Sequence, residues 1–399
     1  MEINLTIQPS TMMENVENEN NIIRIPETYR KNLNLNIGKD IFLKYKNGVV
    51  KNFQTTFAYK EDLLNPWAAY ITKNNFETID LIKQNSITIG CDPEFFLIDT
   101  QTYKTTSAMN YFSYNGNVGN DGLVGEFRPQ YSTNENEVTN NIMNLIKIAR
   151  TKLNNTKNGK NIMLYASSSY NKFAAGYHLH FGLPKFLLVS NKFNNLLLKQ
   201  IVSILDYHVG IVAILPEGVI DIHRRTDNKV IYGKPGAFKF NRTTLEYRTP
   251  GAYLLRHPIL SKGIMAIGLI VIDDIINNLI NNKLLVPNNI QQTLDNLKQC
   301  YNILSHEKIF NAICSPYIFG AMNYLLDIKN NLSTMRLYKQ KEQNIVNFFN
   351  TIENNIKFTG NIETNWRNFY HDEQQKQMVI CKTPIKTNYY TTRGILLEN

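Results

Sequence analysis

Residues 87–99 read ITIGCDPEFFLID, a run whose apolar and acidic side chains alternate as in a β-strand with one polar face. Successive side chains of a strand point to opposite faces. We therefore expect Asp92 and Glu94 to project together, with Cys91 and Phe95 on the other side. This strand would present two carboxylates on one surface.

The same spacing of two polar residues, one position apart, recurs in three later apolar or aromatic runs. The pairs are Glu126 and Arg128 in GEFRP, His178 and His180 in GYHLHFG, and Glu246 and Arg248 in LEYRTP. Any single pair also fits a half-buried antiparallel strand whose polar side faces water. Four pairs favour a site, because these residue types bind metals and phosphates. Crowded carboxylates repel one another unless a cation neutralises them, so the pattern predicts a divalent metal.

These motifs carry a family resemblance. GCDPEFFLID, AAGYHLHFG and TLEYRTP resemble the acidic, His-x-His and Glu-x-Arg strands of glutamine synthetases. The nearer resemblance is to the carboxylate-amine ligase type 2 family, the amidoligases first noticed in phage genomes, which add an Arg-Arg, Tyr-Gly-Lys and Gly-x-Phe segment. In this chain the segment consists of Arg224, Arg225, Tyr232, Gly233, Lys234, Gly236 and Phe238. The resemblance spans roughly residues 87–258 and implies an ATP-dependent ligase that joins a carboxylate to an amine through an acyl phosphate.

The resemblance also implies two metal positions. Asp92, His178 and Glu246 match ligands of the metal that bridges the ATP phosphates, whereas Glu94 and Glu126 match ligands of a metal near the acceptor carboxylate. Mg²⁺ is the implied ion, with Mn²⁺ as an alternative. Mg²⁺ takes oxygen ligands and keeps several waters, which suits a sheet that supplies few carboxylates per ion.

The remaining roles fall on cations and on one carboxylate. Arg248 matches the arginine that steadies the transferring phosphoryl group, and Arg225 or its neighbour would add a second guanidinium. The catalytic set expected from the resemblance is Arg248, Arg225 and Glu126, and the nucleotide-binding set is His180, Arg224, Lys234 and Lys239.

Three positions depart from the family patterns. Asp92 stands where glutamine synthetases have Glu, although the acidic-Pro-Glu-Phe form is typical of the phage-type family. Lys239 stands where an Arg often follows Gly-x-Phe, and FNRTTLEYR lacks the glycine that commonly precedes Glu-x-Arg. None of these departures removes a carboxylate, but they weaken the assignment of the phosphate contacts.

The expected fold is α+β: a glutamine synthetase-like antiparallel sheet, or half-barrel, backed by helices. We expect a flexible arm at 1–21, a small β-rich domain at 22–85, and the ligase domain at 86–399, mainly helical from about 258. The β-rich segment also fits a set of edge strands on the main sheet. Helical spacing of Val138, Ile142, Leu145, Ile146 and Ala149 predicts an amphipathic helix over 134–154, and 193–213 reads as a largely buried helix.

Composition narrows the class of protein. The chain has 399 residues, 43% of them hydrophobic, and lacks an uninterrupted apolar run of about 18 residues or a signal-like N-terminus, so we expect a cytoplasmic protein, in the host if phage-encoded. Four scattered cysteines without metal-site spacing indicate reduced thiols. A formal charge of +10 would suit nucleic acid, but the lysines are dispersed and no nucleic-acid-binding motif occurs.

The expected partners are therefore small-molecule or peptide carboxylates and amines, with no membrane and with an oligomeric state that the sequence leaves open. Two other function classes stay open at this point. One is a catalytically inactive phage structural or interaction protein that retains the fold. The other is a guanidino kinase on the same fold, against which the lack of that family's cysteine motif counts.

Overall fold

The computed structural model describes residues 7–10, 22–25, 30, 40–44, 50–57, 69–72, 87–184, 187, 192–230, 232–240, 244–282, 284–286 and 289–382. Contacts between Cα atoms divide the chain into two compact units: residues 1–86 with 183–185, and residues 87–182 with 186–399. We keep the division into a small domain at 22–85 and a ligase domain at 86–399 as a proposal.

The first unit contains a five-stranded sheet. Its strands, in the order β1-β5-β2-β4-β3, are Ile7–Ser10, Ala69–Thr72, Ile22–Ile25, Val50–Phe57 and Asp40–Lys44. Strand β1 lies within the stretch expected to be a flexible arm, and the rest of residues 1–21 lies outside the described residues.

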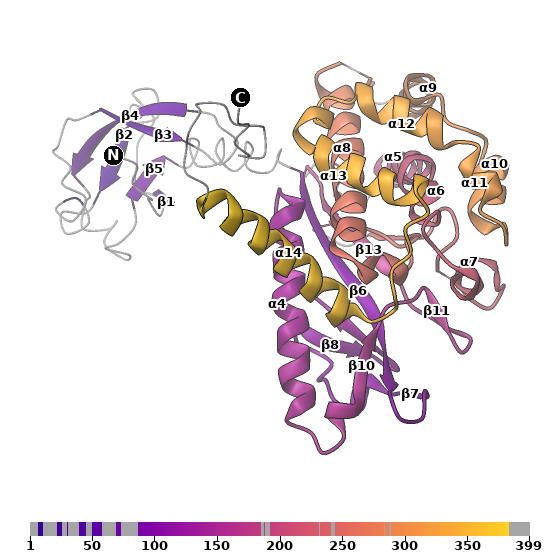
Figure 1. Cartoon of the computed structure of the whole chain (residues 1–399). Helices are drawn as coiled ribbons and strands as arrows, with labels where there is room; N and C mark the ends of the chain where they lie inside the picture. Colours follow the sequence, from indigo (N-terminus) through magenta and orange to yellow (C-terminus); the bar gives the residue numbers. More distant parts are fainter. Residues whose placement is uncertain are drawn as a thin grey trace, which may run out of the picture. The chain divides into compact units, whose positions relative to one another are not determined.

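The second unit is built on an eight-stranded sheet whose longest strand is β6, Thr88–Asp99 (Figure 1). The main path runs β14-β15-β13-β6-β9-β8, with β10 and β7 also paired to β6. The other bounds are Phe238–Phe240 (β14), Thr244–Tyr247 (β15), Tyr177–Gly182 (β13), Val124–Phe127 (β9), Val118–Asp121 (β8), Ile162–Tyr165 (β10) and Thr105–Thr106 (β7). All of these pairings are antiparallel, as predicted.

Helix α8, Pro258–Ile280, packs against one face of this sheet. Sixteen of its residues are buried, and Gly268 lies so close to β13 that an added Cβ would be 2.9 Å from the Phe181 ring. Leu179 also faces this glycine. Because strand side chains alternate, His178 and His180 must point to the opposite face.

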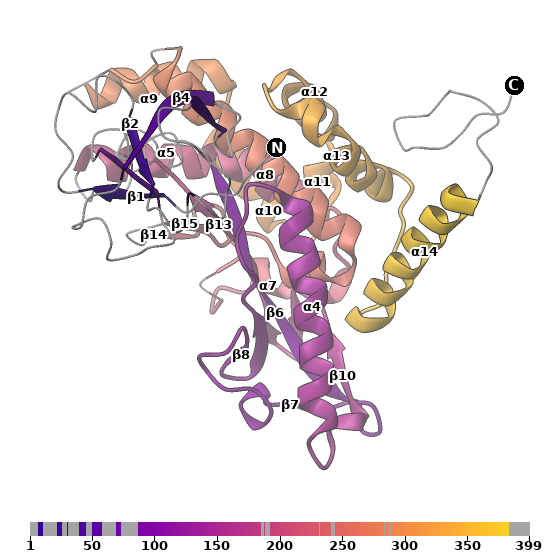
Figure 2. The same ribbon diagram turned by 90° about the vertical axis from the view of Figure 1, so that its left-hand side faces the viewer.

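Helix α4, Glu135–Asn154, confirms the predicted amphipathic helix: Asn134 caps it, and the five residues expected on its apolar face are all buried. In both views this helix runs beside β6 (Figures 1 and 2). The C-terminal region is helical as expected. Its helices after α8 are Ile290–Tyr301 (α9), His306–Cys314 (α10), Phe319–Met322 (α11), Leu325–Thr334 (α12), Tyr338–Glu353 (α13) and Ile362–Lys382 (α14).

The stretch Phe193–Ala213 is long and apolar enough to cross a bilayer, but 78% of its most apolar window is buried inside the fold. It comprises α5 (Lys192–Leu205), a π-helical turn (Asp206–Gly210, η5) and α6 (Ile211–Ala213). The prediction of a largely buried helix is confirmed. The π-helical turn was not predicted.

Four further short elements lie in the connections. A hairpin of β11 (Ser169–Tyr170) and β12 (Phe173–Ala174) lies between β10 and β13, and the helical turns η6 (Val219–Ile222) and α7 (His223–Thr226) lie between α6 and β14. The stretch 108–122, rich in Gly and Asn, contains a 3-10 turn, Ala108–Asn110, and β8, which pairs with β9. Among the described thiols, Cys91, Cys300 and Cys314 are free.

Candidate active site

Strand register gathers the polar pairs on one face of the sheet. His178 lies opposite Asp92, His180 opposite Glu246, and Glu94 opposite Glu126. Residues directly opposite each other in an antiparallel sheet project to the same side. This is the face opposite the one that α8 covers. The structure thus brings together all five residues expected to hold metal.

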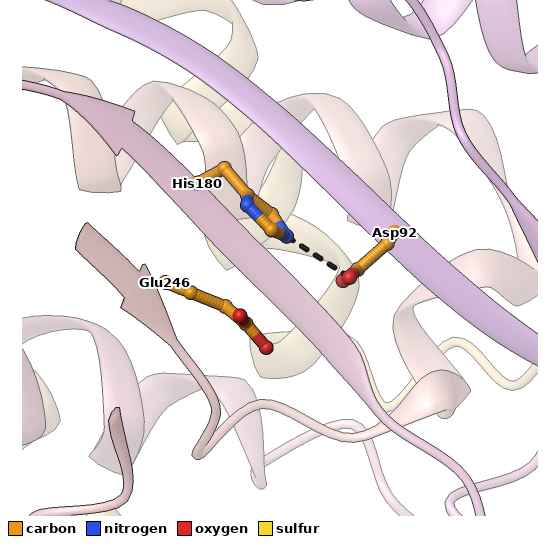
Figure 3. A group of neighbouring side chains, drawn as sticks. All are labelled: Asp92, His180 and Glu246. Atoms are coloured by element: carbon orange, nitrogen blue, oxygen red, sulfur yellow. Dashed lines mark ion pairs between the residues drawn. The ribbon is translucent and has the colours of Figure 1, made fainter. Parts of the chain in front are cut away.

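Asp92, His180 and Glu246 form the tightest group. One ligand atom from each lies within 4.8 Å of the others, and Figure 3 shows the three side chains converging from β6, β13 and β15. His180 Nε2 is 3.0 Å from Asp92 Oδ2. His180 Nε2 and Asp92 Oδ1 are both buried, and their close contacts are ion pairs that lack hydrogen-bond geometry. Two carboxylates and an imidazole in this arrangement have the ligand types that suit a divalent cation.

His178 completes this group from the neighbouring register position. Its Nδ1 lies 3.2 Å from Asp92 Oδ1 and 3.7 Å from Glu246 Oε1. Burial would raise the pKa of Asp92, but the imidazoles of His178 and His180 hold it below its usual range. Burial would likewise lower the pKa of His180, but the Asp92 carboxylate raises it. His180, which was expected to contact nucleotide, is by its distance to Asp92 and Glu246 as well placed to hold metal as His178.

Glu94 and Glu126 form a second carboxylate pair beside the first group. Glu94 accepts a hydrogen bond from the Gly176 backbone N–H at 2.6 Å, and Glu126 forms an ion pair with Arg128. Burial raises the pKa of Glu94, and burial together with the charge of Asp92 raises that of Glu126 to about 8. Two carboxylates whose ionisation is suppressed in this way would gain a neutralising cation readily.

Arg128 has a positioning role in the structure. Its Nη1 donates to the carbonyl oxygens of Tyr114 and Gly116 at 2.9 and 2.8 Å, and an added Cβ at Gly119 would collide with the same guanidinium. The arginine therefore connects Glu126 to the loop that precedes β8.

Arg248 and Arg224 place two guanidinium groups at the edge of this face. Arg248 Nε is 2.9 Å from Glu246 Oε1, and its Cζ lies 3.7 Å from the ring centre of Tyr232. Arg224 is buried and donates to the carbonyl oxygens of Thr249 (2.6 Å) and Arg248 (2.8 Å). Burial lowers the pKa of Arg224 to about 10, so this residue stays charged at neutral pH.

Arg225 does not join these cations. Its side chain is 2% exposed and donates to Glu217 Oε2 at 3.0 Å, to the Ile313 carbonyl at 2.8 Å and to the Ser315 carbonyl. These contacts connect α7 to the end of α10. The catalytic role expected for Arg225 from the Arg-Arg motif is therefore not supported by its position, because adjacent residues of a short helix point in different directions.

The two lysines lie on β14 and on the turn that precedes it. Lys239 is exposed on β14 and stands opposite Glu246 in the strand register. Lys234 is half-buried, and its carbonyl oxygen lies 3.0 Å from the Thr249 hydroxyl. Both stay candidates for anion contacts.

Two contributors received no role from the sequence. Tyr232 stacks on Arg248 and meets the His178 ring edge to face at 6.3 Å, and Gly176 supplies the N–H that binds Glu94. An added Cβ at Gly176 would also collide with the His178 imidazole. The glycine just before the His-x-His strand is the sequence signal that could have revealed this backbone donor.

An antiparallel sheet that gathers carboxylates, imidazoles and guanidinium groups on one face offers the side chains that suit divalent cations and anionic groups. The sequence matches the family Phage phiEco32-like COOH.NH2 ligase-type 2 over residues 89–367, and the chain belongs to this family. It is thus a member of a family of carboxylate-amine ligases, as predicted. Comparison with curated protein sequences gave no match.

The structure has low similarity to several solved ligases. A bifunctional glutathione synthetase from Pasteurella multocida has a TM-score of 0.33 and 11% identity, over 71% of this chain and 54% of that one. A novel glutamine synthase homolog has a TM-score of 0.32 and 11% identity, over 79% of this chain and 82% of that one. GmaS in complex with ADP has a TM-score of 0.33 and 11% identity, over 75% of this chain and 83% of that one. The chain thus spans about half the length of the glutathione synthetase.

Proposed function

We propose that the chain is an ATP-dependent carboxylate-amine ligase that forms an amide bond with the help of Mg²⁺, or of Mn²⁺ in its place. The γ-phosphoryl group of ATP would pass to the substrate carboxylate, ADP would leave, and the amine would then displace phosphate from the acyl phosphate. The proposed substrates are a small-molecule or peptide carboxylate and an amine. The single observation that carries the proposal is the convergence of Asp92, His180 and Glu246, with His178 beside them.

The acidic and imidazole side chains would hold cations, and the guanidinium groups would hold phosphoryl oxygens. A divalent cation held by this group would neutralise phosphoryl oxygens during the transfer. Arg248 would hold a phosphoryl group in its planar fork, because Tyr232 and Glu246 fix the guanidinium on two sides. Glu94 and Glu126 would hold a second cation near the carboxylate substrate, and the buried Arg224 would keep positive potential behind both.

The proposal can be tested without knowing the substrates, through thermal unfolding of Glu94→Gln. In EDTA we expect the variant to melt above wild type, because a neutral amide of the same shape replaces an ionisable carboxyl that is buried opposite Glu126. The glutamine can still accept from Gly176. With Mg²⁺ and ATP the order should reverse, because wild type would bind the ligand and the variant would bind it much less. A ligand at roughly a hundred times its dissociation constant stabilises the folded state by about 2.7 kcal/mol.

Glu342→Gln is the matched control, because Glu342 pairs with Lys339 on an exposed part of α13 and should respond to neither condition. Wild-type melting that is indifferent to Mg²⁺-ATP, with no gain for Glu94→Gln in EDTA, would favour the inactive structural protein instead.

A second prediction concerns Arg248→Lys. The lysine keeps the charge but loses the fork and the stacking on Tyr232. We expect kcat for ADP formation to fall by about 10²-fold, as when one fixed donor to a developing charge is removed, with a smaller change in KM for ATP. Equal changes in both constants would mean that Arg248 only binds nucleotide.

A further inference from the structure

The π-helical turn Asp206–Gly210 contacts β15, the strand that ends at Tyr247, next to Arg248. Asp206 is 2% exposed, and its Oδ1 accepts a hydrogen bond from the Tyr247 hydroxyl at 2.8 Å. The other carboxylate oxygen, Oδ2, accepts from the Gly236 backbone N–H at 2.7 Å. One buried side chain thus contacts both β15 and the turn that precedes β14.

Gly210, at the other end of the π-helical turn, leaves room for the same strand. A Cβ at this position would lie 2.6 Å from the Tyr247 hydroxyl and 3.4 Å from a Thr249 methyl group. The turn therefore accommodates β15 in two ways: Asp206 accepts hydrogen bonds from it, and Gly210 provides the space. Single π-helical turns inside α-helices occur frequently at functional sites.

Thr249 extends this contact to the loop. Its hydroxyl has one proton to donate and lies 3.2 Å from Asp206 Oδ1 and 3.0 Å from the Lys234 carbonyl. In addition, the Arg248 backbone N–H donates to the Ala237 carbonyl at 2.8 Å. The segment Tyr232–Ala237 is therefore fixed at its C-terminal end to the same residues that flank Arg248.

The opposite end of this loop carries Tyr232, whose ring stacks on Arg248. Gly233, with φ of +88°, passes so close to Arg224 that a Cβ would lie 2.6 Å from its Nη1. The loop thus contacts both guanidinium groups. Its geometry depends on where Gly236 is held, and Asp206 accepts the hydrogen bond of the Gly236 N–H.

We propose that Asp206 is a positioning residue, which fixes Arg248 and the Tyr232–Ala237 loop relative to each other from behind the sheet. This role rests on the proposed function, in which Arg248 holds a phosphoryl group. A carboxylate buried only for stability could take its hydrogen bonds from any neighbour. Those of Asp206 come from Tyr247, next to Arg248, and from Gly236, on the loop that begins at Tyr232, with the Thr249 hydroxyl also within reach. Burying a carboxylate is costly unless such bonds compensate it.

The test is Asp206→Asn in the full-length chain, measured by hydrogen–deuterium exchange. The amide keeps the shape of the side chain but has only one accepting oxygen. With that oxygen on the Gly236 N–H, its NH₂ group faces the buried Tyr247 hydroxyl, whose proton then loses its acceptor. Peptides that contain Gly236 and Arg248 should exchange about tenfold faster, with the α8 peptides unchanged, because about one hydrogen bond's worth of local stability is lost.

Asp327→Asn is the matched control. Asp327 accepts from the hydroxyl of Tyr207, the next residue of the same turn, but connects it to α12 rather than to the sheet. Exchange at Gly236 and Arg248 should stay at the wild-type rate in this variant. If Asp206→Asn does not fold, Tyr247→Phe decides, because it removes one partner of Asp206 and should accelerate exchange at Arg248 more than at Gly236.

Two outcomes would overturn the proposal: exchange in Asp206→Asn no faster than in Asp327→Asn, or exchange accelerated equally in α8. In a wild type that forms ADP, Asp206→Asn should lower kcat by about tenfold while KM for ATP changes less, as expected for a misplaced catalytic group. Because exchange needs no turnover, a wild type that forms no ADP would refute the proposed function but leave the positioning of Arg248 to be decided by exchange.

Discussion

Glu246→Gln is expected to abolish ADP formation while leaving the fold intact. The Glu246 carboxylate lies 3.7 Å from His178 and 2.9 Å from Arg248, and it belongs to the group whose ligand atoms lie within 4.8 Å of one another. Glutamine keeps the shape but removes the charge. A metal contributes several kcal/mol of charge stabilisation, so its loss should lower kcat by about 10³-fold or more.

The measurement is ADP release with pooled amino acids and cell-wall peptides, together with a melting curve. Glu363→Gln serves as a control. Glu363 accepts a hydrogen bond from Arg150 Nε at 2.7 Å, outside the site, so this variant should release ADP at the wild-type rate. If Glu246→Gln turns over ATP at the wild-type rate, the assignment of Glu246 as a metal ligand fails.

Arg225→Ala is expected to produce the largest loss of stability. Removing the guanidinium leaves Glu217 buried without its ion-pair partner and two carbonyl oxygens without their donor. Burial already raises the pKa of Glu217, since a lone charge is unfavourable there. Breaking a buried pair in this way costs about 3–5 kcal/mol of unfolding free energy.

Urea denaturation measures this loss against Arg336→Ala. Arg336 forms an ion pair with Asp273 at 2.6 Å, but its side chain is 55% exposed, so its removal should cost about 0–1 kcal/mol. An Arg225→Ala variant as stable as Arg336→Ala, yet inactive, would restore the catalytic role that the Arg-Arg motif first suggested.

Local patterns were enough to predict the elements that carry the site. Alternation placed Asp92 and Glu94 on one face of a strand, and the apolar spacing from Val138 to Ala149 identified α4, because period and burial are encoded in neighbouring residues. Short or irregular elements were not predicted from the sequence. β8 lies in what reads as a glycine- and asparagine-rich loop, and the π-helical turn Asp206–Gly210 has the composition of an ordinary buried helix.

The residue pattern alone indicates which strands carry carboxylates, imidazoles and guanidinium groups, and that the two members of each pair share a face. Which of these side chains meet depends on the packing of the strands in space. Strand β6 comes first in the chain but lies between β13 and β9 in the spatial order β15-β13-β6-β9. Asp92 on β6 therefore contacts His178 and His180, which lie more than 80 positions later in the sequence. The tertiary structure also separated Arg224 from Arg225, one at the site and one in a buried ion pair with Glu217. Strand order and side-chain direction in short helices depend on contacts between residues far apart in the chain, and no local pattern records them.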